Sequence, residues 1–262
     1  MSIGDFLQQA TATLTQAGIT TARLDVLVLL SDALDRDKSW ILAHNNDELP
    51  TRTLQGLQQK ITTRAARTPL AYIRGKQAFY GRDFAVTPDV LIPRPETETL
   101  IDLLKIYKPA RVLDVGTGSG AVAVSAASEL PNAAIDACDI SQAALDIAAK
   151  NAKDLGVNVH FIASDLLQNV RGQYDAIAAN LPYVSKHWQR SPETNAEPSL
   201  ALFAEDDGLA LIKRLLVQAP GHLNPGGYVL LEADPRQHKT IAVSPGFKHV
   251  TTDNFIIVLQ KI

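Results

Sequence analysis

Cysteine is almost missing from this chain, since Cys138 is the single cysteine among 262 residues. One thiol excludes a disulfide framework and a cysteine-rich metal site, and it suits a reducing compartment, so we expect a cytoplasmic location. Long apolar runs are missing too. No stretch is long enough to cross a bilayer, and the opening MSIGDFLQQATATLTQ lacks the basic and then apolar order of a secretion signal, so no membrane partner is expected.

A charge excess is also lacking, because 25 Lys and Arg face 28 Asp and Glu for a net charge of -3. Such a balance gives no overall field for holding a polyanion, so no direct nucleic-acid partner is expected. The six histidines include no pair at the spacing of helical metal ligands, so no metal site is expected. A basic cluster near the end of the first domain consists of Arg64, Arg67, Arg74 and Lys76. We interpret it as a solvated face in preference to a contact surface for an acidic partner.

The first part of the chain has a helical pattern. Ser2 with Asp5 resembles a capping box, apolar residues follow at helix spacing, and Gly18 ends this first helix. Two more helices are predicted around Leu24–Leu34 and Leu54–Ile61, with no strand between them. Residues 1–70 are therefore predicted to form a small helical domain, which we expect to recognise the substrate protein.

The pattern changes twice after that. Residues 71–90 contain aromatic and β-branched residues broken at Gly75 and Gly81, which predicts a β-hairpin linker. In residues 91–262, the apolar runs RVLDVG, AAIDACDI, VNVHFIAS, YDAIAAN and YVLLEAD are separated mostly by helical stretches, which is typical of a parallel sheet covered on both faces. FKHVTTD and FIIVLQKI follow with only a turn between them, so the last strand is expected to be antiparallel.

A glycine-rich loop follows the first of these strands and opens a helix. The segment is Asp114-Val115-Gly116-Thr117-Gly118-Ser119-Gly120-Ala121, and its backbone N–H groups are expected to converge beside a cofactor. The loop also satisfies the dinucleotide fingerprint, and Asp139 at the end of the next strand suits the ribose of either NAD or S-adenosylmethionine. Asp114 favours S-adenosylmethionine, because a carboxylate would repel a phosphate but attract a cationic amino group.

The run YDAIAAN ends in Asn180-Leu181-Pro182-Tyr183, at the sheet edge where ligands of open α/β sheets bind. The Asn180 side-chain oxygen and a backbone carbonyl of the turn are suited to accept the two N–H hydrogens of a planar amide, and to aim its nitrogen at an activated methyl group. Tyr183 supplies an aromatic face for the amide or a sulfonium. No His or Glu is expected near this turn, which fits a reaction that needs no general base.

These segments together resemble the HemK/PrmC family of class I methyltransferases, which modify a glutamine side chain of peptide chain release factors. The likeness spans nearly the whole chain. It rests on PLAYIRGKQAFYGRDFAVTPDVLIPRPETE, DVGTGSGAVAVSAA, ACDIS, SDLL and NLPY, in that family's order and spacing, and IPRPETE is the most specific piece.

The resemblance implies an α/β fold of the class I S-adenosylmethionine-dependent type, Rossmann-like, with a seven-stranded mostly parallel sheet, an antiparallel last strand and a small N-terminal helical domain. It implies S-adenosylmethionine as cofactor and a release factor as protein partner. We also expect a monomer. The residues it assigns to the cofactor are Asp114, Gly116, Thr117, Gly118, Ser119, Gly120, Asp139, Ile140, Asp165, Leu166 and Asn180. The catalytic segment it assigns is Asn180, Leu181, Pro182 and Tyr183, with Ile92–Glu98 helping to close the pocket.

The chain departs from the family at two positions. Leu181 stands where the family usually has proline, although Pro182 still biases it towards an extended conformation. Leu166 stands where many relatives carry an aromatic residue, which predicts weaker packing on adenine. The alternatives that stay open are methylation of a ribosomal-protein glutamine, methylation of adenine in nucleic acid, an NAD-linked oxidoreductase, and a non-catalytic adaptor that binds the cofactor.

Overall fold

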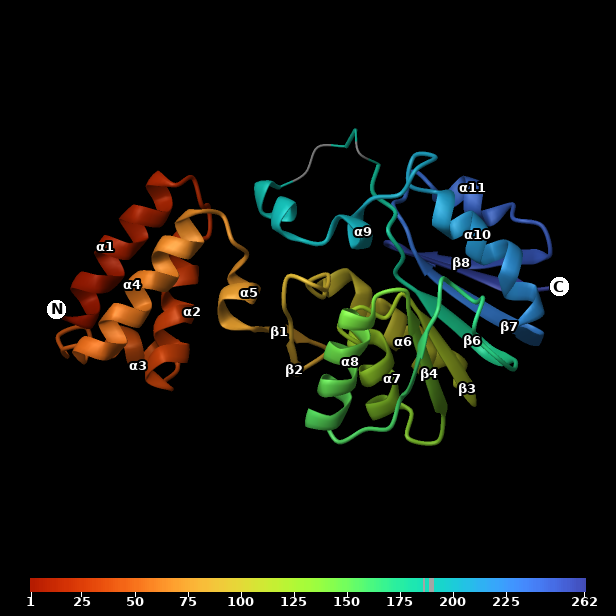
Figure 1. Ribbon diagram of the computed structural model, residues 1–262, viewed down its shortest axis with the longest axis horizontal. Coiled ribbons are helices and arrows are strands. Elements are labelled where there is room, and N and C mark those ends of the chain that lie inside the picture. The colour runs from red at the N-terminus through yellow and green to blue at the C-terminus, as the bar shows by residue number, and fades with distance from the viewer. Residues whose placement is uncertain (186, 189–190) are drawn as a thin grey trace. The chain divides into compact units, whose positions relative to one another are not determined.

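The computed structural model describes residues 1–185, 187–188 and 191–262. The chain divides into two compact units. Met1–Gly75 with Ser191–Ala196 form the helical unit, and Lys76–Arg190 with Glu197–Ile262 form the sheet unit. Figure 1 shows the elements of each. Within the described ranges, no helix combines the length and apolar character needed to span a membrane.

The helical unit contains five α-helices and a 3₁₀ helix, and apolar side chains from α1, α2 and α4 meet in its core. The helices are α1 (Ile3–Gln16), α2 (Ala22–Leu34), α3 (Lys38–Ala43), α4 (Thr51–Ala65), α5 (Leu70–Arg74) and the 3₁₀ helix η2 (Pro192–Ala196). The predicted capping box is confirmed, because the Ser2 hydroxyl accepts from Asp5 N while the Asp5 carboxylate accepts from Ser2 N. The short α3 and α5 are not predicted by the apolar spacing.

The hairpin prediction is wrong for residues 71–74, which are helical. Pro69 precedes the helix and Gly75 ends it with a left-handed φ of 73°. Proline at the start and glycine at the end are a helix signature. The antiparallel pair itself is β1 (Lys76–Phe79) and β2 (Arg82–Ala85), and it belongs to the sheet unit.

The basic cluster is paired with carboxylates, and the solvated-face interpretation is wrong for Arg64. Arg64 is buried, and its Nε donates to the buried Asp25 at 2.7 Å. Arg64 and Arg67 also donate to Glu193. The Ser191 hydroxyl, and after it these two guanidinium groups, lower the pKa of the Glu193 carboxyl to about 2. Arg74 pairs with Asp32, and Lys76 with Asp83.

The large sheet has seven strands in the order β5-β4-β3-β6-β7-β9-β8. Their bounds are β3 (Arg111–Val115), β4 (Ala134–Asp139), β5 (His160–Ala163), β6 (Tyr174–Ala179), β7 (Leu223–Glu232), β8 (Phe247–Asp253) and β9 (Ile256–Lys261). Strands β3 to β7 pair in parallel, whereas β9 runs antiparallel to both of its neighbours, β7 and β8. The predicted mostly parallel sheet with an antiparallel last strand is confirmed.

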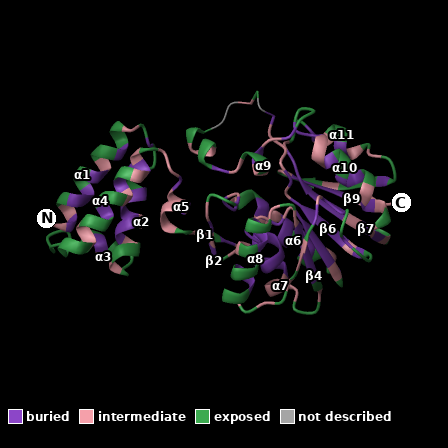
Figure 2. Cartoon of the chain, in the orientation of Figure 1, coloured by how far each residue is buried: buried purple, intermediate pink, exposed green. Residues whose placement is uncertain are grey.

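Helices cover both faces of this sheet because neighbouring side chains of each strand point to opposite faces. Val112 and Ala176 pack with α6 (Glu98–Tyr107) and α7 (Ala121–Glu129), while Leu113 and Ile177 pack with α10 (Ala210–Gln218). The remaining helices are α8 (Gln142–Asp154), α9 (Ser199–Leu202), α11 (His238–Ala242) and the 3₁₀ helices η1 (Pro95–Thr97) and η3 (Ala219–Gly221). Figure 2 shows strands such as β4 and β6 in the middle of the sheet unit as largely buried.

The carboxyl ends of the parallel strands bring the predicted site segments to one edge of the sheet. Val115 pairs in register with Cys138 and Ala179, and Ala179 pairs with Leu231. The glycine loop, Asp139, Asn180 and Glu232 therefore follow the same edge. Behind the loop, the buried Asn151 of α8 donates to Ser119 O at 2.8 Å and bonds both backbone groups of Ala85, which fixes the loop against β2.

Candidate functional site

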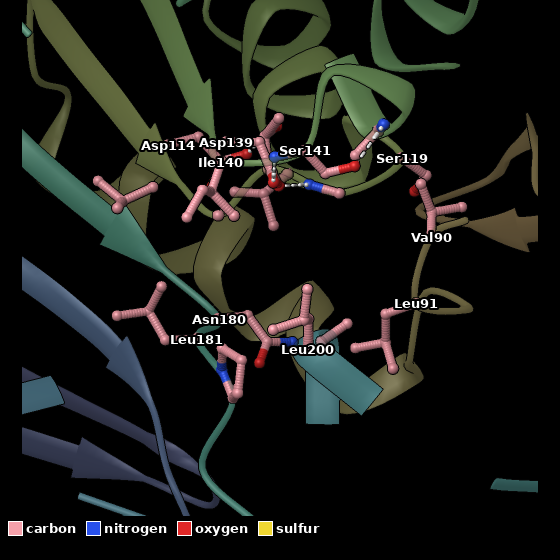
Figure 3. Close-up of a pocket in the computed structure, with 18 of the residues that line it drawn as sticks. Val90, Leu91, Asp114, Ser119, Asp139, Ile140, Ser141, Asn180, Leu181 and Leu200 are labelled. Carbon is pink, nitrogen blue, oxygen red and sulfur yellow. Dashed lines mark hydrogen bonds between the residues drawn. The ribbon is translucent and has the colours of Figure 1, made fainter. Parts of the chain in front are cut away.

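A cavity of about 400 Å³ opens at this edge and lies within the sheet unit. Figure 3 shows Asp114, Asp139, Ile140 and Ser141 on one side of it and Asn180, Leu181 and Leu200 on the other. The predicted residues that line it are Asp114, Gly116, Thr117, Gly118, Ser119, Asp139, Ile140, Asp165, Leu166, Asn180, Leu181 and Pro182. Gly120 and Tyr183 are not among its lining residues.

Four backbone N–H groups of the glycine loop donate to acceptors within the protein. The expectation that the loop N–H groups face a ligand is wrong for these four residues. Gly116 N and Thr117 N donate to Cys138 O at 2.8 and 3.0 Å, and Gly120 N donates to Thr117 O. Gly118 N donates to the Asp139 carboxylate at 2.9 Å. These four N–H groups are therefore not free to donate to a dinucleotide pyrophosphate.

Gly120 has a packing role in the structure. Its φ is +80°, and a Cβ there would lie 3.0 Å from the Ala148 Cβ, so glycine lets α7 and α8 approach closely. Gly118 differs, because its φ is +55° but nothing lies within 4 Å of an added Cβ. Gly118 thus gives a ligand close access to the main chain, whereas Gly120 shapes the scaffold.

Asp114 is a buried carboxylate at the cavity wall and at the N-terminus of α7. Its Oδ2 accepts from the Thr117 hydroxyl at 2.6 Å and from Ala123 N at 3.2 Å. None of the ion pairs found in the described part of the chain involves it. Burial raises the pKa of Asp114 to about 7, against the lowering effect of those two hydrogen bonds. A buried carboxylate without a cationic partner is suited to receive a cationic group of a ligand.

Asp139 ends β4 and holds the next turn as well as the loop. Its Oδ1 accepts from Ser141 N at 2.9 Å, while its Oδ2 accepts from Gly118 N. A carboxylate has about four lone-pair sites, so both oxygens keep acceptor capacity towards the cavity. Beside it, the exposed Ile140 and the buried Leu166 add apolar surface, and Asp165 is held by Arg214 Nη2 at 2.7 Å.

The opposite wall is apolar and comes from the segment before α6 and from α9. Val90, Leu91 and Pro93 line the cavity together with Leu200, whose side chain is otherwise exposed. This wall is held by the buried Glu197, which accepts from Ile92 N at 3.2 Å and from Arg94 at 2.5 Å. The IPRPETE segment therefore helps to enclose the cavity.

Asn180 and Leu181 begin the turn after β6. Asn180 Nδ2 donates to the Thr97 hydroxyl at 3.1 Å, so the amide nitrogen is bonded to the protein. The buried Leu181 side chain packs over the glycine loop, because a Cβ added at Gly116 would lie 3.0 Å from Leu181 Cδ2. The turn and the glycine loop are thus in direct contact.

Tyr183 anchors the end of the same turn away from the cavity lining. Its hydroxyl donates to Glu232 at 3.1 Å, and its carbonyl accepts from the buried Gln237 amide at 3.0 Å. Burial and the neighbouring Glu232 raise the pKa of the Tyr183 hydroxyl. A side chain at Gly208, whose φ is +86°, would collide with the Tyr183 carbonyl, so glycine is required there.

Sequence reasoning missed Glu232 and Gln237, and it placed Thr97 in the pocket-closing segment Ile92–Glu98 without giving it a role of its own. The expectation that no Glu stands near the turn is wrong, because Glu232 ends β7, in the strand beside β6, and contacts Tyr183. The sequence offers one signal for Glu232, namely its place as an acid near the end of the apolar run YVLLEAD. Parallel pairing brings the end of this strand to the sheet edge that holds Asn180.

Cys138 is a core residue as predicted, and burial raises the pKa of its thiol to about 12. Across the described residues, no group of three or more His, Cys, Asp or Glu could hold a metal ion.

Comparisons with known proteins agree with this architecture. A family model described as the PrmC N-terminal domain matches residues 5–75, and one described as the methyltransferase small domain matches residues 95–196. A release factor glutamine methyltransferase of Deinococcus radiodurans is 37% identical over 249 residues, which cover 92% of this chain and 89% of that protein. One from Coxiella burnetii is 37% identical and covers 98% of this chain and 97% of its own length.

Among solved structures, a methyltransferase from Pyrococcus furiosus superimposes with a TM-score of 0.52 at 21% identity, over 78% of this chain and 96% of its own. A 16S rRNA methyltransferase from Thermus thermophilus, solved with AdoMet and guanosine, gives a TM-score of 0.51 at 17% identity, over 71% of this chain and 49% of its own. Both likenesses concern the fold alone.

Proposed function

Because this chain belongs to the release factor glutamine methyltransferase family, we propose that it transfers a methyl group from S-adenosylmethionine to the side-chain amide nitrogen of a glutamine in a peptide chain release factor. The resemblance inferred from the motifs is confirmed by these relatives. The protein is an enzyme of the methyltransferase class, and its fold is that of the class I methyltransferases.

The residues present fit S-adenosylmethionine. Asp114 offers a buried carboxylate without an ion-pair partner to the amino group of the methionine end. Asp139 offers acceptors to the ribose hydroxyls, and Ile140 with Leu166 offers apolar surface to the adenine. When bound, the cofactor supplies a methyl group already activated by a sulfonium.

The substrate side needs hydrogen-bond acceptors, and Asn180 is suited to provide one. A carboxamide nitrogen is a poor nucleophile because its lone pair is delocalised into the carbonyl. If the Asn180 side-chain oxygen and a backbone carbonyl of the turn accept both N–H hydrogens, the nitrogen gains electron density and its lone pair is oriented. Orientation of this kind is worth roughly 7–11 kcal/mol in a well-formed site.

One observation carries this proposal: Asn180 lines the same cavity as Asp114 and Asp139 while its Nδ2 is bonded to Thr97. With the nitrogen occupied, the side-chain oxygen is the end of the amide that remains for a substrate. One cavity thus holds both an acceptor for an amide N–H and a carboxylate for the methyl donor.

The competing functions are less well supported. An NAD-linked enzyme needs donors for a pyrophosphate, and four N–H groups of the glycine loop are already bonded within the protein. Adenine methylation in nucleic acid is disfavoured by charge, because residues 81–262 carry 16 basic and 21 acidic side chains. Given the proposed activity, we also propose that the chain acts as a monomer in the cytoplasm, with the release factor as its protein partner.

The test is methyl transfer with purified components. The protein, S-adenosylmethionine and a recombinant release factor are incubated, and peptides are examined by mass spectrometry for a methyl group on one glutamine. Asn180→Ala should abolish the product while S-adenosylhomocysteine still binds. A modified ribosomal-protein glutamine, or methylated adenine in parallel incubations, together with an unmodified release factor, would reject the proposal.

A further inference from the structure

A chain of four side chains starts at the cavity wall, where Asn180 and Thr97 lie, and continues behind it to Glu232 and Tyr183. We call this chain the Asn180 relay. Asn180 Nδ2 donates to the Thr97 hydroxyl at 3.1 Å, and that hydroxyl donates to Glu232 Oε2 at 2.6 Å. The other carboxylate oxygen, Oε1, accepts from the Tyr183 hydroxyl at 3.1 Å. The relay joins the 3₁₀ helix η1 to the ends of two neighbouring strands, β6 and β7.

The carboxylate of Glu232 decides the direction of every bond in the relay. A hydroxyl has one hydrogen to donate, and an ionised carboxylate only accepts. Since Thr97 gives its hydrogen to Glu232, it can only accept from Asn180, and the amide must turn its nitrogen towards Thr97. The reversed amide would place its oxygen against the lone pairs of the Thr97 hydroxyl.

Burial makes this selection strict. Thr97 is 4% exposed and Glu232 is 1% exposed, so water cannot readily replace a lost partner. Burial also raises the pKa of Glu232, while the hydrogen bonds from Thr97 and Tyr183 lower it. A buried group that loses its partner carries the full cost of its desolvation.

We propose that Thr97 and Glu232 are positioning residues that hold the Asn180 carboxamide with its oxygen towards the substrate glutamine, and that the same carboxylate fixes the Tyr183 ring. This inference rests on the proposed function, because it explains how Asn180 becomes an obligatory acceptor. Thr97 and Glu232 act through Asn180 and Tyr183 and need no contact with the substrate.

Paired substitutions at Thr97 test the relay. Thr97→Val keeps the shape but removes the hydroxyl, so Nδ2 of the half-buried Asn180 would lose its partner in the productive amide orientation. We expect kcat/KM for the release factor to fall about tenfold, which corresponds to one neutral hydrogen bond. Thr97→Ser restores the hydroxyl and should recover most of the activity, while the Kd of S-adenosylhomocysteine stays within about twofold in both variants.

Ser125→Ala is the matched control for loss of a buried hydroxyl. Ser125 lies in α7 with 0% exposure, and its Oγ has no partner within the described structure, so this variant should keep wild-type kcat/KM. If Thr97→Ser is as slow as Thr97→Val, the hydroxyl is not what matters and the inference is wrong.

A second readout separates the relay from the activity itself. In protein labelled with ¹⁵N-asparagine, the side-chain NH₂ signals of Asn180 are assigned by their loss in Asn180→Asp. These signals should shift in Thr97→Val and return in Thr97→Ser, without any substrate; Thr97→Ala replaces the valine variant if that one does not fold. Unchanged signals in Thr97→Val would overturn the relay. If the signals shift in Thr97→Val but the wild-type protein methylates no release factor, the proposed function alone is rejected.

Discussion

If Asp114 receives the amino group of the cofactor as proposed, its buried carboxylate should make cofactor affinity depend on pH. In the free protein, burial holds the pKa of Asp114 at about 7, so the carboxyl is increasingly protonated below that pH. A bound amino cation favours the ionised form and lowers the pKa. The affinity for the cofactor is therefore highest above the pKa that Asp114 has in the free protein, and it falls as the pH drops through this pKa.

The size of the effect follows from the ionised fraction. With a pKa of about 7, this fraction drops from about 0.76 at pH 7.5 to about 0.09 at pH 6.0, so the Kd rises about eightfold, or about 1.2 kcal/mol. The amino group of the ligand remains mostly protonated across this window, because α-amino groups titrate near pH 8. Asp114 therefore dominates the expected change.

Calorimetric titration with S-adenosylhomocysteine, which carries the same amino acid end and cannot react, measures this dependence directly. Asp114→Asn should bind more weakly at pH 7.5 and show nearly the same Kd at both pH values. An unchanged Kd between pH 6.0 and 7.5 in the wild type would refute the reasoning, and so would an equal pH dependence in the Asn variant.

Further expectations concern the turn and the scaffold. Leu181→Pro should change kcat for methyl transfer to a release factor by less than about threefold, because Pro182 already keeps residue 181 extended. One added ring alters the free energy of unfolding by only about 0.4–1 kcal/mol. A large gain in kcat would support the adaptor hypothesis instead. Arg64→Ala should lower the unfolding free energy of the helical unit by about 3–5 kcal/mol in urea melts, because the buried Asp25 loses its partner. Lys150→Ala, which breaks an exposed ion pair, should lower the unfolding free energy by only about 0.3–0.5 kcal/mol. Equal losses in the two variants would contradict the expected role of burial. Gly56→Ala in α4, where nothing lies within 4 Å of the added Cβ, should raise the melting temperature by stabilising the helix about 0.5–1 kcal/mol, and a lower melting temperature would contradict it.

The sheet and the position of the site were predictable from local patterns. Short apolar runs alternating with helical stretches specify a covered parallel sheet, and in such a sheet the segments that follow the strands meet at one edge. For this reason the sequence predicts one site for Asp114, Asp139 and Asn180, although they are far apart along the chain. The structure brings all three to one cavity.

The direction of the hydrogen bonds was not predictable. The N–H groups of the glycine loop point to Cys138 and Asp139, and the sequence alone does not tell whether a glycine turn bonds to its neighbour strand or to a ligand. The bond from Thr97 to Glu232 joins residues 135 positions apart in the chain. Such pairs depend on rotamers and burial, which periodicity does not encode.

The contact between Leu181 and the glycine loop has a consequence for engineering. Residue 181 fills the space over Gly116, where a side chain on the loop has no room, and it also lines the cavity. Trimming residue 181 to alanine is therefore expected to widen the cavity beside Gly116, whereas adding a side chain to the loop glycine would crowd it.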